Sequence, residues 1–264
     1  MVKYEIIETE IDDSGKIATV FLNRASQLNA FNIQHIDELI TFFTEISNND
    51  SIRCLIITGK GKAFCAGGDV TEFMSAENPG EFMAELAKRL HKGIKILKNM
   101  NKITVAAING ACFGAGLGYA TACDFRFSSE NAAYGCAFTR IGLSPDSSTT
   151  FHLPKLVGLN LAYEMLFLNR TLKAQEAFQY GLVNKVFKSE EFMYEVKKVT
   201  EELSQGPSTA FFFTKKLLNE SFANTLNSHL DREAEEIVKT ARTEDFQEGL
   251  KAFFEKRNPK FLGK

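Results

Sequence analysis

The chain has 264 residues, of which 44% are hydrophobic and 24% charged, and its formal net charge at pH 7 is −2. This length can bury a full core in one large domain, or in one domain with an appendage. The near-neutral charge gives no bulk attraction to nucleic acid or to an anionic membrane, so neither is expected as a partner. No apolar run approaches the length that spans a membrane.

The amino-terminal residues and the cysteines both indicate a cytoplasmic protein. Glutamates at positions 5, 8 and 10 interrupt the apolar stretch that a secretory signal peptide requires. The cysteines are odd in number, form no C-x-x-C pair and mostly lie among apolar or small residues. We therefore expect reduced thiols, mostly in the core, with no disulfide and no metal site, at Cys54, Cys65, Cys112, Cys123 and Cys136.

Predicted strands and helices alternate along the first two thirds of the chain. Short β-branched runs predict strands over 17–22, 54–58 and 103–108, and the last two are nearly continuous in apolar residues, as in a sheet covered on both faces. Apolar residues at helical spacing predict helices over 33–46 and 81–100, with a mobile loop over 75–80. From about Lys173 the strand signal fades and helices remain. This order predicts an α/β fold with a mainly parallel sheet and a helical carboxy-terminal part.

Two runs of small residues, 63–69 and 109–118, each stand between a predicted strand and a predicted helix. Backbone N–H groups in such turns can approach a ligand without obstruction. If the fold brings the two turns together, one carbonyl oxygen can accept hydrogen bonds from both, which stabilises negative charge that develops on it. The alternative is that the small residues serve only tight packing of strand against helix. That interpretation suits either run alone better than both together.

These two runs, together with the segments 21–30, 141–146 and 248–261, resemble the enoyl-CoA hydratase/isomerase, or crotonase, superfamily in the right order along the whole chain. The resemblance implies an α/β spiral of ββα units over residues 1–200, which binds and processes an acyl-CoA thioester. It also implies that residues 201–264 form a helical region for trimerisation and closure of the CoA pocket. The expected assembly is a homotrimer or a dimer of trimers. No cofactor is expected beyond the CoA that enters as part of the substrate.

Carried over position by position, the resemblance makes the N–H groups of Gly68 and Ala115 the oxyanion donors. Arg24 is the expected phosphate partner, since guanidinium meets phosphate oxygens in a bidentate way, although it could also be a solvated turn residue. Asp69 is expected to cap its own loop in a supporting role. The full set expected to bind substrate or CoA is Arg24, Gln27, Leu28, Ala63, Ala66, Gly67, Asp69, Val70, Phe138, Lys260 and Phe261.

The chain departs from the hydratases that it resembles at the two glutamates that position and activate water. Gly118 and Phe138 occupy those places, so we expect hydratase activity to be absent. Asp146 remains, in the loop where isomerases of the superfamily carry a lone acid, and one carboxylate suffices to move a proton between two carbons. We therefore predict an enoyl-CoA double-bond or ring isomerase with Asp146 as its base. Alternatively, Asp146 merely caps the helix that follows it.

His91, on the second predicted helix, supports a different enzyme. Aryl-CoA dehalogenases of the superfamily resemble the chain in having a histidine on this helix and an aspartate on this loop, which attacks the ring while the histidine activates water. Those enzymes also place an indole near the Phe138 position, whereas this chain has no tryptophan. A dehalogenase or an acyl-CoA hydrolase using Asp146 and His91 thus remains an alternative, as does a non-catalytic CoA-binding protein. The spacing of Gly114, Gly116 and Gly118 does not fit a dinucleotide-binding turn.

Overall fold

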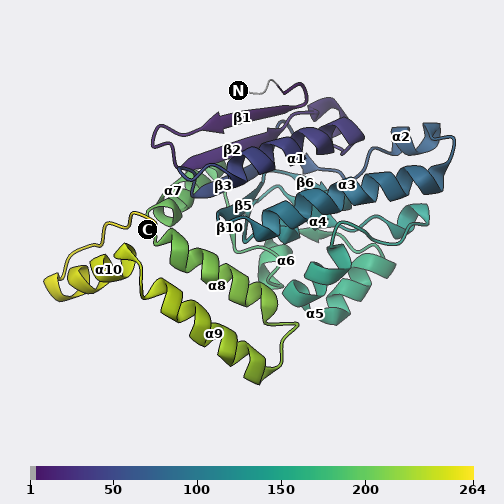
Figure 1. Ribbon diagram of the computed structural model, residues 1–264. Helices are drawn as coiled ribbons and strands as arrows, with labels where there is room; N and C mark the ends of the chain where they lie inside the picture. Colours follow the sequence, from purple (N-terminus) through teal and green to yellow (C-terminus); the bar gives the residue numbers. More distant parts are fainter. Residues whose placement is uncertain (1–3) are drawn as a thin grey trace.

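The larger of two sheets has six strands in the order β1-β2-β3-β5-β7-β10 (Figure 1). The computed structural model describes residues 4–264. All strand pairs of this sheet are parallel except β1 with β2, and β3 and β5 are buried along almost their whole length, which confirms the predicted parallel sheet with both faces covered. Its strands are β1 (Ile7–Ile11), β2 (Ile17–Leu22), β3 (Cys54–Gly59), β5 (Ile103–Ile108), β7 (Phe125–Ser129) and β10 (Lys185–Phe187).

The smaller sheet has the order β4-β6-β8-β9, and its strands are β4 (Ala63–Cys65), β6 (Ala111–Phe113), β8 (Ala133–Gly135) and β9 (Leu172–Lys173). Three times, the chain passes from a strand of the large sheet to a strand of the small sheet and then into a helix. The helices that follow are α2 (Val70–Ser75), α4 (Ala115–Ala122) and α5 (Thr149–Phe167). This repeat confirms the spiral of ββα units.

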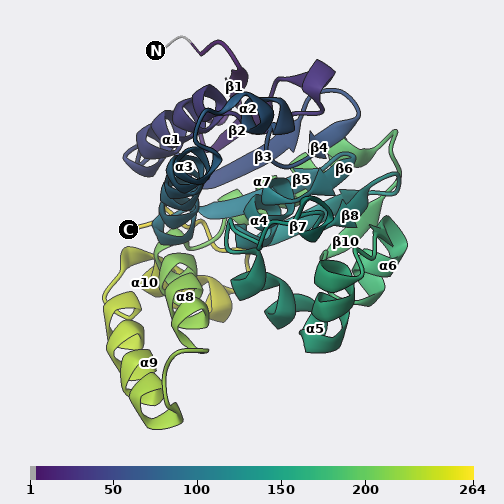
Figure 2. The same cartoon turned by 90° about the vertical axis from the view of Figure 1, so that its right-hand side faces the viewer.

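Helices cover both faces of the large sheet. On one side α1 (Ile33–Ser47) lies beside α3 (Pro79–Asn99), as Figures 1 and 2 show. On the other side α7 (Phe192–Ser204) packs through Phe192 and Val196. The predicted loop before α3 is only three residues long, because Asn78 accepts a hydrogen bond from Glu81 N and Pro79 begins the helix.

Two parts of the fold differ from the sequence prediction. The expectation that only helices follow Lys173 was wrong, because β10 pairs with β7. Three residues with a lysine at the first position carry too little periodicity to be recognised without that partner strand. Strand β1, which pairs with β2, was also not predicted. All five cysteines are buried and free, as expected.

The carboxy-terminal helices are α6 (Ala174–Gln179), α8 (Ser208–Glu220), α9 (Leu226–Thr240) and α10 (Glu244–Glu255). Figure 1 shows α9 and α10 leading away from the sheets. Buried Lys215 ties α8 to the core: its Nζ donates to Asp124 Oδ2 at 2.8 Å and to the carbonyls of Leu97 and Lys102. The predicted boundary at residue 200 falls inside α7, which packs on the large sheet.

Candidate active site

The two small-residue turns meet at one edge of the small sheet. Strands β4 and β6 run parallel, with Cys65 beside Cys112, so the turns that follow them leave in the same direction. A Cβ on Gly67 would lie 3.7 Å from Ala115 N, and a Cβ on Gly114 would lie 3.3 Å from the Cα of Gly67. Both glycines have positive φ, 109° and 52°. The turns therefore lie so close that an added Cβ would be in contact with the other turn, and both depend on glycine conformations.

Each turn carries an N–H group without a protein acceptor. Phe31 donates to Gly67 O at 2.7 Å and accepts from Asp69 N at 2.9 Å, so the intervening Gly68 N–H points away from Phe31. Ala115 is the first residue of α4, where an N–H has no acceptor within the helix. Within residues 4–264, neither N–H donates a hydrogen bond to another protein group. Two free donors thus stand on adjacent turns.

Aromatic side chains wall this edge of the sheet. A Cβ on Gly68 would lie 2.4 Å from Phe73 Cζ, so the Phe73 ring covers that residue. Phe73 in turn packs against Phe82, with ring centroids 6.0 Å apart. Phe138 approaches from the third ββα unit, with its Cζ 4.0 Å from the place of a Cβ on Gly114. The sequence predicted Phe138 here but not Phe73 or Phe82, since nothing in their spacing identifies the turn that they cover.

Arg24 and Asp69 form a partly buried ion pair behind the first turn. Arg24 Nη2 lies 2.8 Å from Asp69 Oδ2, and its Nη1 donates to Ala30 O at 2.6 Å. The Asp69 carboxylate also accepts from Thr71 N and so caps α2, which is the supporting role expected of it. Burial raises the pKa of this carboxyl, but the bonds from Arg24 and Thr71 outweigh burial and leave that pKa below its usual value. Arg24 is thus not a solvated turn residue: it shapes the turn.

Asp146 is half-buried in the loop before α5. Burial, the largest influence, raises the pKa of its carboxyl above the usual value, although hydrogen bonding and His91 act in the opposite direction. Ser147 Oγ donates to Asp146 Oδ1 at 2.9 Å. The Asp146 side chain does not cap α5: the cap residue is Ser148, whose side chain makes no capping bond to the backbone, and the Asp146 carbonyl accepts from Thr149 N. Ser147 and Ser148 both adopt positive φ, a costly conformation for residues other than glycine.

His91 lies beside this loop. Its Nε2 accepts a hydrogen bond from Ser147 N at 3.3 Å, which an imidazole nitrogen does only when it carries no proton. The ring is exposed and belongs to α3, so the bond ties α3 to the loop that carries Asp146. The two residues predicted for catalysis are thus brought together through Ser147, which the sequence prediction overlooked.

Gly118, where the resemblance leads us to expect the first hydratase glutamate, has no room for a side chain. A Cβ on Gly118 would lie 2.3 Å from Ser147 O and 2.7 Å from Ser147 Cβ. Gly118 is buried in α4, and the Asp146 loop packs directly on it. No side chain fits at this position while the loop keeps its place.

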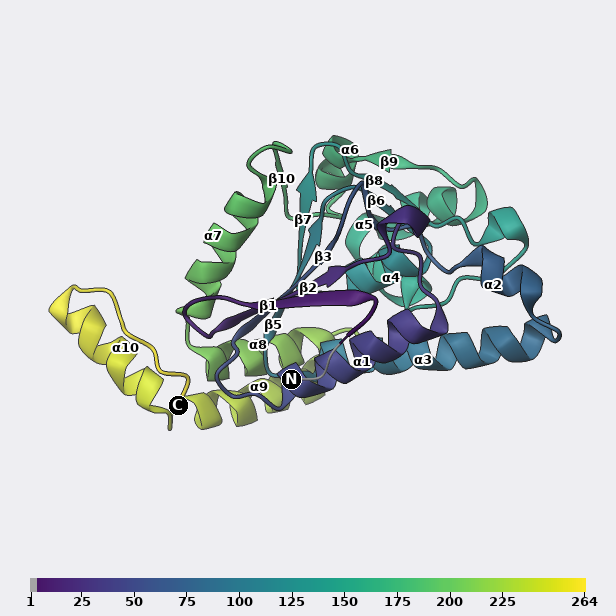
Figure 3. The same cartoon turned by 90° about the horizontal axis from the view of Figure 1, so that it is seen from above.

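The remaining predicted residues divide into two groups. Gln27 and Leu28 are exposed near the first turn, and Leu28 O accepts from Ala66 N at 3.0 Å, while Val70 is exposed and Ala63 is buried. Lys260 and Phe261 lie in the tail after α10, where Phe261 O accepts from Arg53 and Lys260 N donates to Glu248. Figure 3 shows α10 and α2 at opposite ends of the molecule. Within one chain, the tail therefore does not reach the turns.

The structure was also searched for metal-binding groups and for membrane-spanning helices. No group of three or more potential metal ligands occurs in the part of the chain that the structure describes. Nor does any helix between residues 4 and 264 combine the length and the apolar character of a membrane span.

Comparison with known proteins gives consistent matches over nearly the whole chain. The family model described as enoyl-CoA hydratase/isomerase matches residues 12–264. Crotonyl-CoA hydratase of Syntrophomonas wolfei is 34% identical over 99% of both chains. The 4-chlorobenzoyl coenzyme A dehalogenase-2 of an Arthrobacter species is 32% identical, covering 92% of this chain and 89% of the relative. The 1,2-epoxyphenylacetyl-CoA isomerase of Escherichia coli is 30% identical, covering 94% and 95%.

The fold has equally close counterparts among solved structures. The crystal structure of a putative enoyl-CoA hydratase/isomerase from Mycobacterium abscessus superposes with a TM-score of 0.93 at 31% identity, covering 98% of this chain and all of that one.

Proposed function

Because the chain belongs to the enoyl-CoA hydratase/isomerase family, whose members process acyl-CoA thioesters, we propose that it is an isomerase that moves a double bond or rearranges a ring with Asp146 as its only acid-base residue. One observation carries the choice. Ser147 fills the space at Gly118 that a second carboxylate would need, and the adjacent residue, Asp146, has a carboxyl of raised pKa.

The proposed reaction places the thioester carbonyl oxygen between the N–H groups of Gly68 and Ala115. These donors stabilise the enolate oxygen that forms when Asp146 removes a proton from the acyl chain, a contribution of about 3 kcal/mol for each donor. The protonated Asp146 then returns the proton to another carbon, and the enolate electrons re-form the carbonyl. Nothing is oxidised or reduced, so the reaction needs no redox cofactor, and the two N–H groups provide the stabilisation of the enolate oxygen that a metal would otherwise give. A raised pKa suits a carboxylate that must accept and then release a proton.

Binding of CoA is proposed at the segment from Arg24 to Leu28 and at the turn from Ala66 to Val70, with Ala63 and Phe138 behind them. The bond between Ala66 N and Leu28 O holds the two segments side by side. Lys260 and Phe261 would complete the pocket from a second copy, because their own tail lies at the far end of the molecule.

A homotrimer, or a dimer of trimers, is also proposed, because the CoA pocket needs a second copy. Helices α9 and α10 expose large apolar side chains that a lone chain leaves in water, and apolar surface of this kind marks protein contacts. They include Leu226, Leu230, Ile237, Phe253 and Phe254, whose exposed fractions range from 51% to 79%.

The proposal is tested by turnover of three substrates: a 3-enoyl-CoA, a 2-enoyl-CoA and a 4-halobenzoyl-CoA. We expect the 3-enoyl-CoA to be converted to its 2-enoyl isomer and water not to add to the 2-enoyl-CoA. Asp146→Asn should lower isomerase turnover by about 10²–10⁴-fold while CoA affinity is unchanged. Turnover that survives this substitution would show that another group is the base. CoA binding without turnover of any substrate would instead indicate a non-catalytic binding protein.

A dehalogenase or hydrolase is the second candidate, favoured by the link from His91 to the Asp146 loop and by the Arthrobacter relative. In that reaction Asp146 would attack the ring carbon, halide would leave, and water would hydrolyse the resulting aryl ester. Halide release from the 4-halobenzoyl-CoA identifies this activity directly. We favour the isomerase because His91 Nε2, the atom that would take a proton from water, already accepts from Ser147 N.

A further inference from the structure

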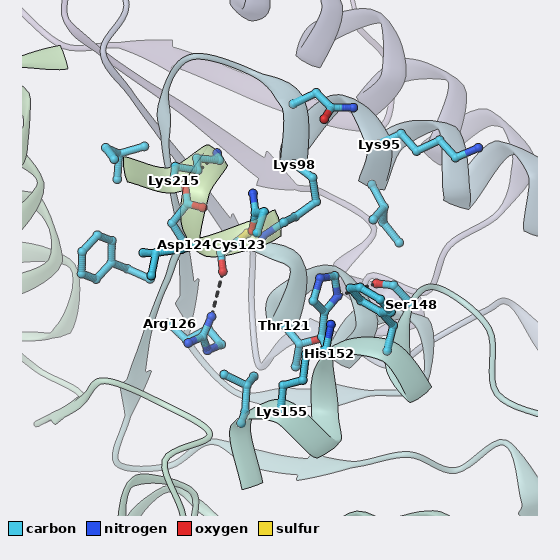
Figure 4. Close-up of a pocket in the computed structure, with 18 of the residues that line it drawn as sticks. Lys95, Lys98, Thr121, Cys123, Asp124, Arg126, Ser148, His152, Lys155 and Lys215 are labelled. Atoms are coloured by element: carbon cyan, nitrogen blue, oxygen red, sulfur yellow. Dashed lines mark hydrogen bonds and ion pairs between the residues drawn. The ribbon is translucent and has the colours of Figure 1, made fainter. Parts of the chain in front are cut away.

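A cavity of about 930 Å³ lies between α3, the start of α5 and α8, apart from the paired turns (Figure 4). Gly68, Ala115 and Asp146 do not line it, whereas His91 and Ser148, which flank the Asp146 loop, do. Its volume is within the range of small-molecule sites in proteins. The reaction proposed above makes no use of this space.

One wall of the cavity is an apolar helix face. Phe211 and Leu218 lie on α8 seven residues apart, and Phe222 follows four residues later, so all three line one side. Leu156 on α5 and Leu203 on α7 add to this lining. An alkyl chain could lie along this wall with most of its surface removed from water.

Lysine side chains also line the cavity. Figure 4 shows Lys95, Lys98 and Lys155 around the cavity. Lys98 is half-buried, and Lys155 Nζ lies over the rings of Phe151 and Phe222, 3.2 and 4.8 Å from their centroids. Within residues 4–264, neither Lys98 nor Lys155 forms an ion pair with a carboxylate.

The other charged groups of the lining are already satisfied. The Asp124 carboxylate accepts from Lys215 Nζ, Thr104 N and Thr104 Oγ1. Arg126 donates to the carbonyls of Cys123 and Leu182. The cavity therefore holds an excess of positive charge that its only carboxylate does not offset.

The pKa shifts of the lining residues agree with this excess of positive charge. Burial lowers the pKa of Lys98, and burial together with Lys98, Lys155 and Arg126 lowers the pKa of His152 to about 4. Groups that destabilise one another in this way gain from a bound anion, because an opposite charge nearby favours the charged form of each lysine.

We propose that this cavity binds an amphiphile with an acid headgroup, a carboxylate or a phosphate, and an alkyl tail. The headgroup lies between Lys98 and Lys155, and the tail follows Phe211 and Leu218 on α8. The cavity adjoins the Asp146 loop through His91 and Ser148 but does not include the paired turns, so the proposed headgroup site lies beside the proposed acyl-CoA site.

The test is isothermal titration of the full chain with decanoate, decyl phosphate and decanol, in saturating CoA so that the acyl-CoA site is occupied. We expect saturable binding of at least one of the two acids and at least tenfold weaker binding of decanol. The tighter of the two acids identifies the headgroup. Decanol that binds as tightly as the acids, or the absence of saturable binding, overturns the proposal.

Variants locate the site. The double variant Lys98→Gln/Lys155→Gln should weaken binding of the acid at least tenfold, whereas Lys198→Gln, at an exposed lysine of α7 outside the cavity, should leave it unchanged. Thr214→Trp, at an exposed residue of the lining, should block binding by filling the space. Unchanged affinity in both cavity variants contradicts the assignment. Lost oligomer mass in Thr214→Trp, with no acid binding in the unmodified chain, means that a second copy fills the cavity, which also overturns it.

Asp146→Asn separates this proposal from the isomerase proposal, since Asp146 does not line the cavity and its substitution should leave binding of the acid unchanged.

Discussion

The paired turns and the Asp146 loop lie near one another but are built in different ways. In the turns, the polar atoms are peptide N–H groups, which a strand bridge at Phe31 and the start of α4 hold in place. In the loop, the polar atoms are those of a side chain, and its place depends on Gly118 of α4, His91 of α3 and two strained serines. Backbone chemistry of the first kind tolerates many side chains nearby, provided that glycine stays where the turn needs it. Side-chain chemistry of the second kind depends on contacts from several elements.

The turns should be the more sensitive of the two regions to an added methyl group. Gly67→Ala places a Cβ at φ 109°, 3.4 Å from Phe113 O and 3.5 Å from the Cα of Gly114. We expect turnover of a 3-enoyl-CoA to fall about 10²–10³-fold, the size of effect seen when an oxyanion donor is lost. Gly15→Ala is the matched control, because it has φ 70° and nothing within 4 Å. Equal activity of the two variants would show that the turn geometry has no catalytic role.

The second largest effect is expected when α4, which packs against the Asp146 loop, is altered at Gly118. Gly118→Ala brings a Cβ within 2.3 Å of Ser147 O, so the loop has to move. We expect a loss of about 1–3 kcal/mol in the free energy of unfolding, as in other overpacked cores, with reduced isomerase turnover. Gly80→Ala on α3, whose Cβ would meet only Asn78 Oδ1 at 3.7 Å, should lose neither.

A glutamate at the same position tests whether the protein can be given hydratase activity. Gly118→Glu should be at least as unstable as Gly118→Ala and should not gain the ability to hydrate a 2-enoyl-CoA. A gain of hydratase activity would mean that the loop can move aside, and the preference for an isomerase would then lose its main support.

The difference between the two regions also explains what the sequence could predict. Strands β2, β3 and β5, helices α1 and α3, and both turns follow from local patterns, since burial on both faces and runs of small residues leave a direct mark on the sequence. The placement of Asp146 does not. The sequence left open whether Asp146 caps α5, whereas in the structure the cap residue is Ser148 and the Asp146 side chain makes no bond to the first turn of the helix.

Contacts between elements that are far apart in the sequence also could not be predicted from local patterns. The bond between Ser147 N and His91 Nε2, the ring of Phe73 over Gly68 and the pairing of β10 with β7 each depend on how elements far apart in the sequence pack. The tail that carries Lys260 and Phe261 lies far from the turns of its own chain, so its predicted place at the CoA pocket depends on a second copy, which the sequence pattern does not position.

Substitutions at His91 test whether this residue only positions the Asp146 loop or acts as a general base. If His91 only accepts from Ser147 N, His91→Ala should lower kcat about fivefold to tenfold, in line with one lost hydrogen bond. His91→Gln retains an acceptor and should restore most of the rate, with an unchanged pH profile. Equal, large losses in both variants, with a shifted pH profile, would identify His91 as a proton-transfer group and favour the hydrolytic alternative.

The smallest expected effect is on the free energy of unfolding, which the partly buried Asp146 carboxylate lowers at neutral pH. Because the folded-state pKa of Asp146 lies above its unfolded value of about 3.9, folding is favoured while the group is protonated, and this advantage is lost as the pH rises through the folded-state pKa. Asp146→Asn carries no charge and can still accept from Ser147 Oγ. It should therefore be more stable than the unmodified chain at neutral pH, and the difference should shrink as the pH falls towards 4. Thermal melts at pH 4, 5.5 and 7 measure the difference, with Asp13→Asn, at an exposed carboxylate, as a control. A variant that is less stable at pH 7 would mean that the charged carboxylate stabilises the loop, which is the behaviour of a structural residue and not of a buried base.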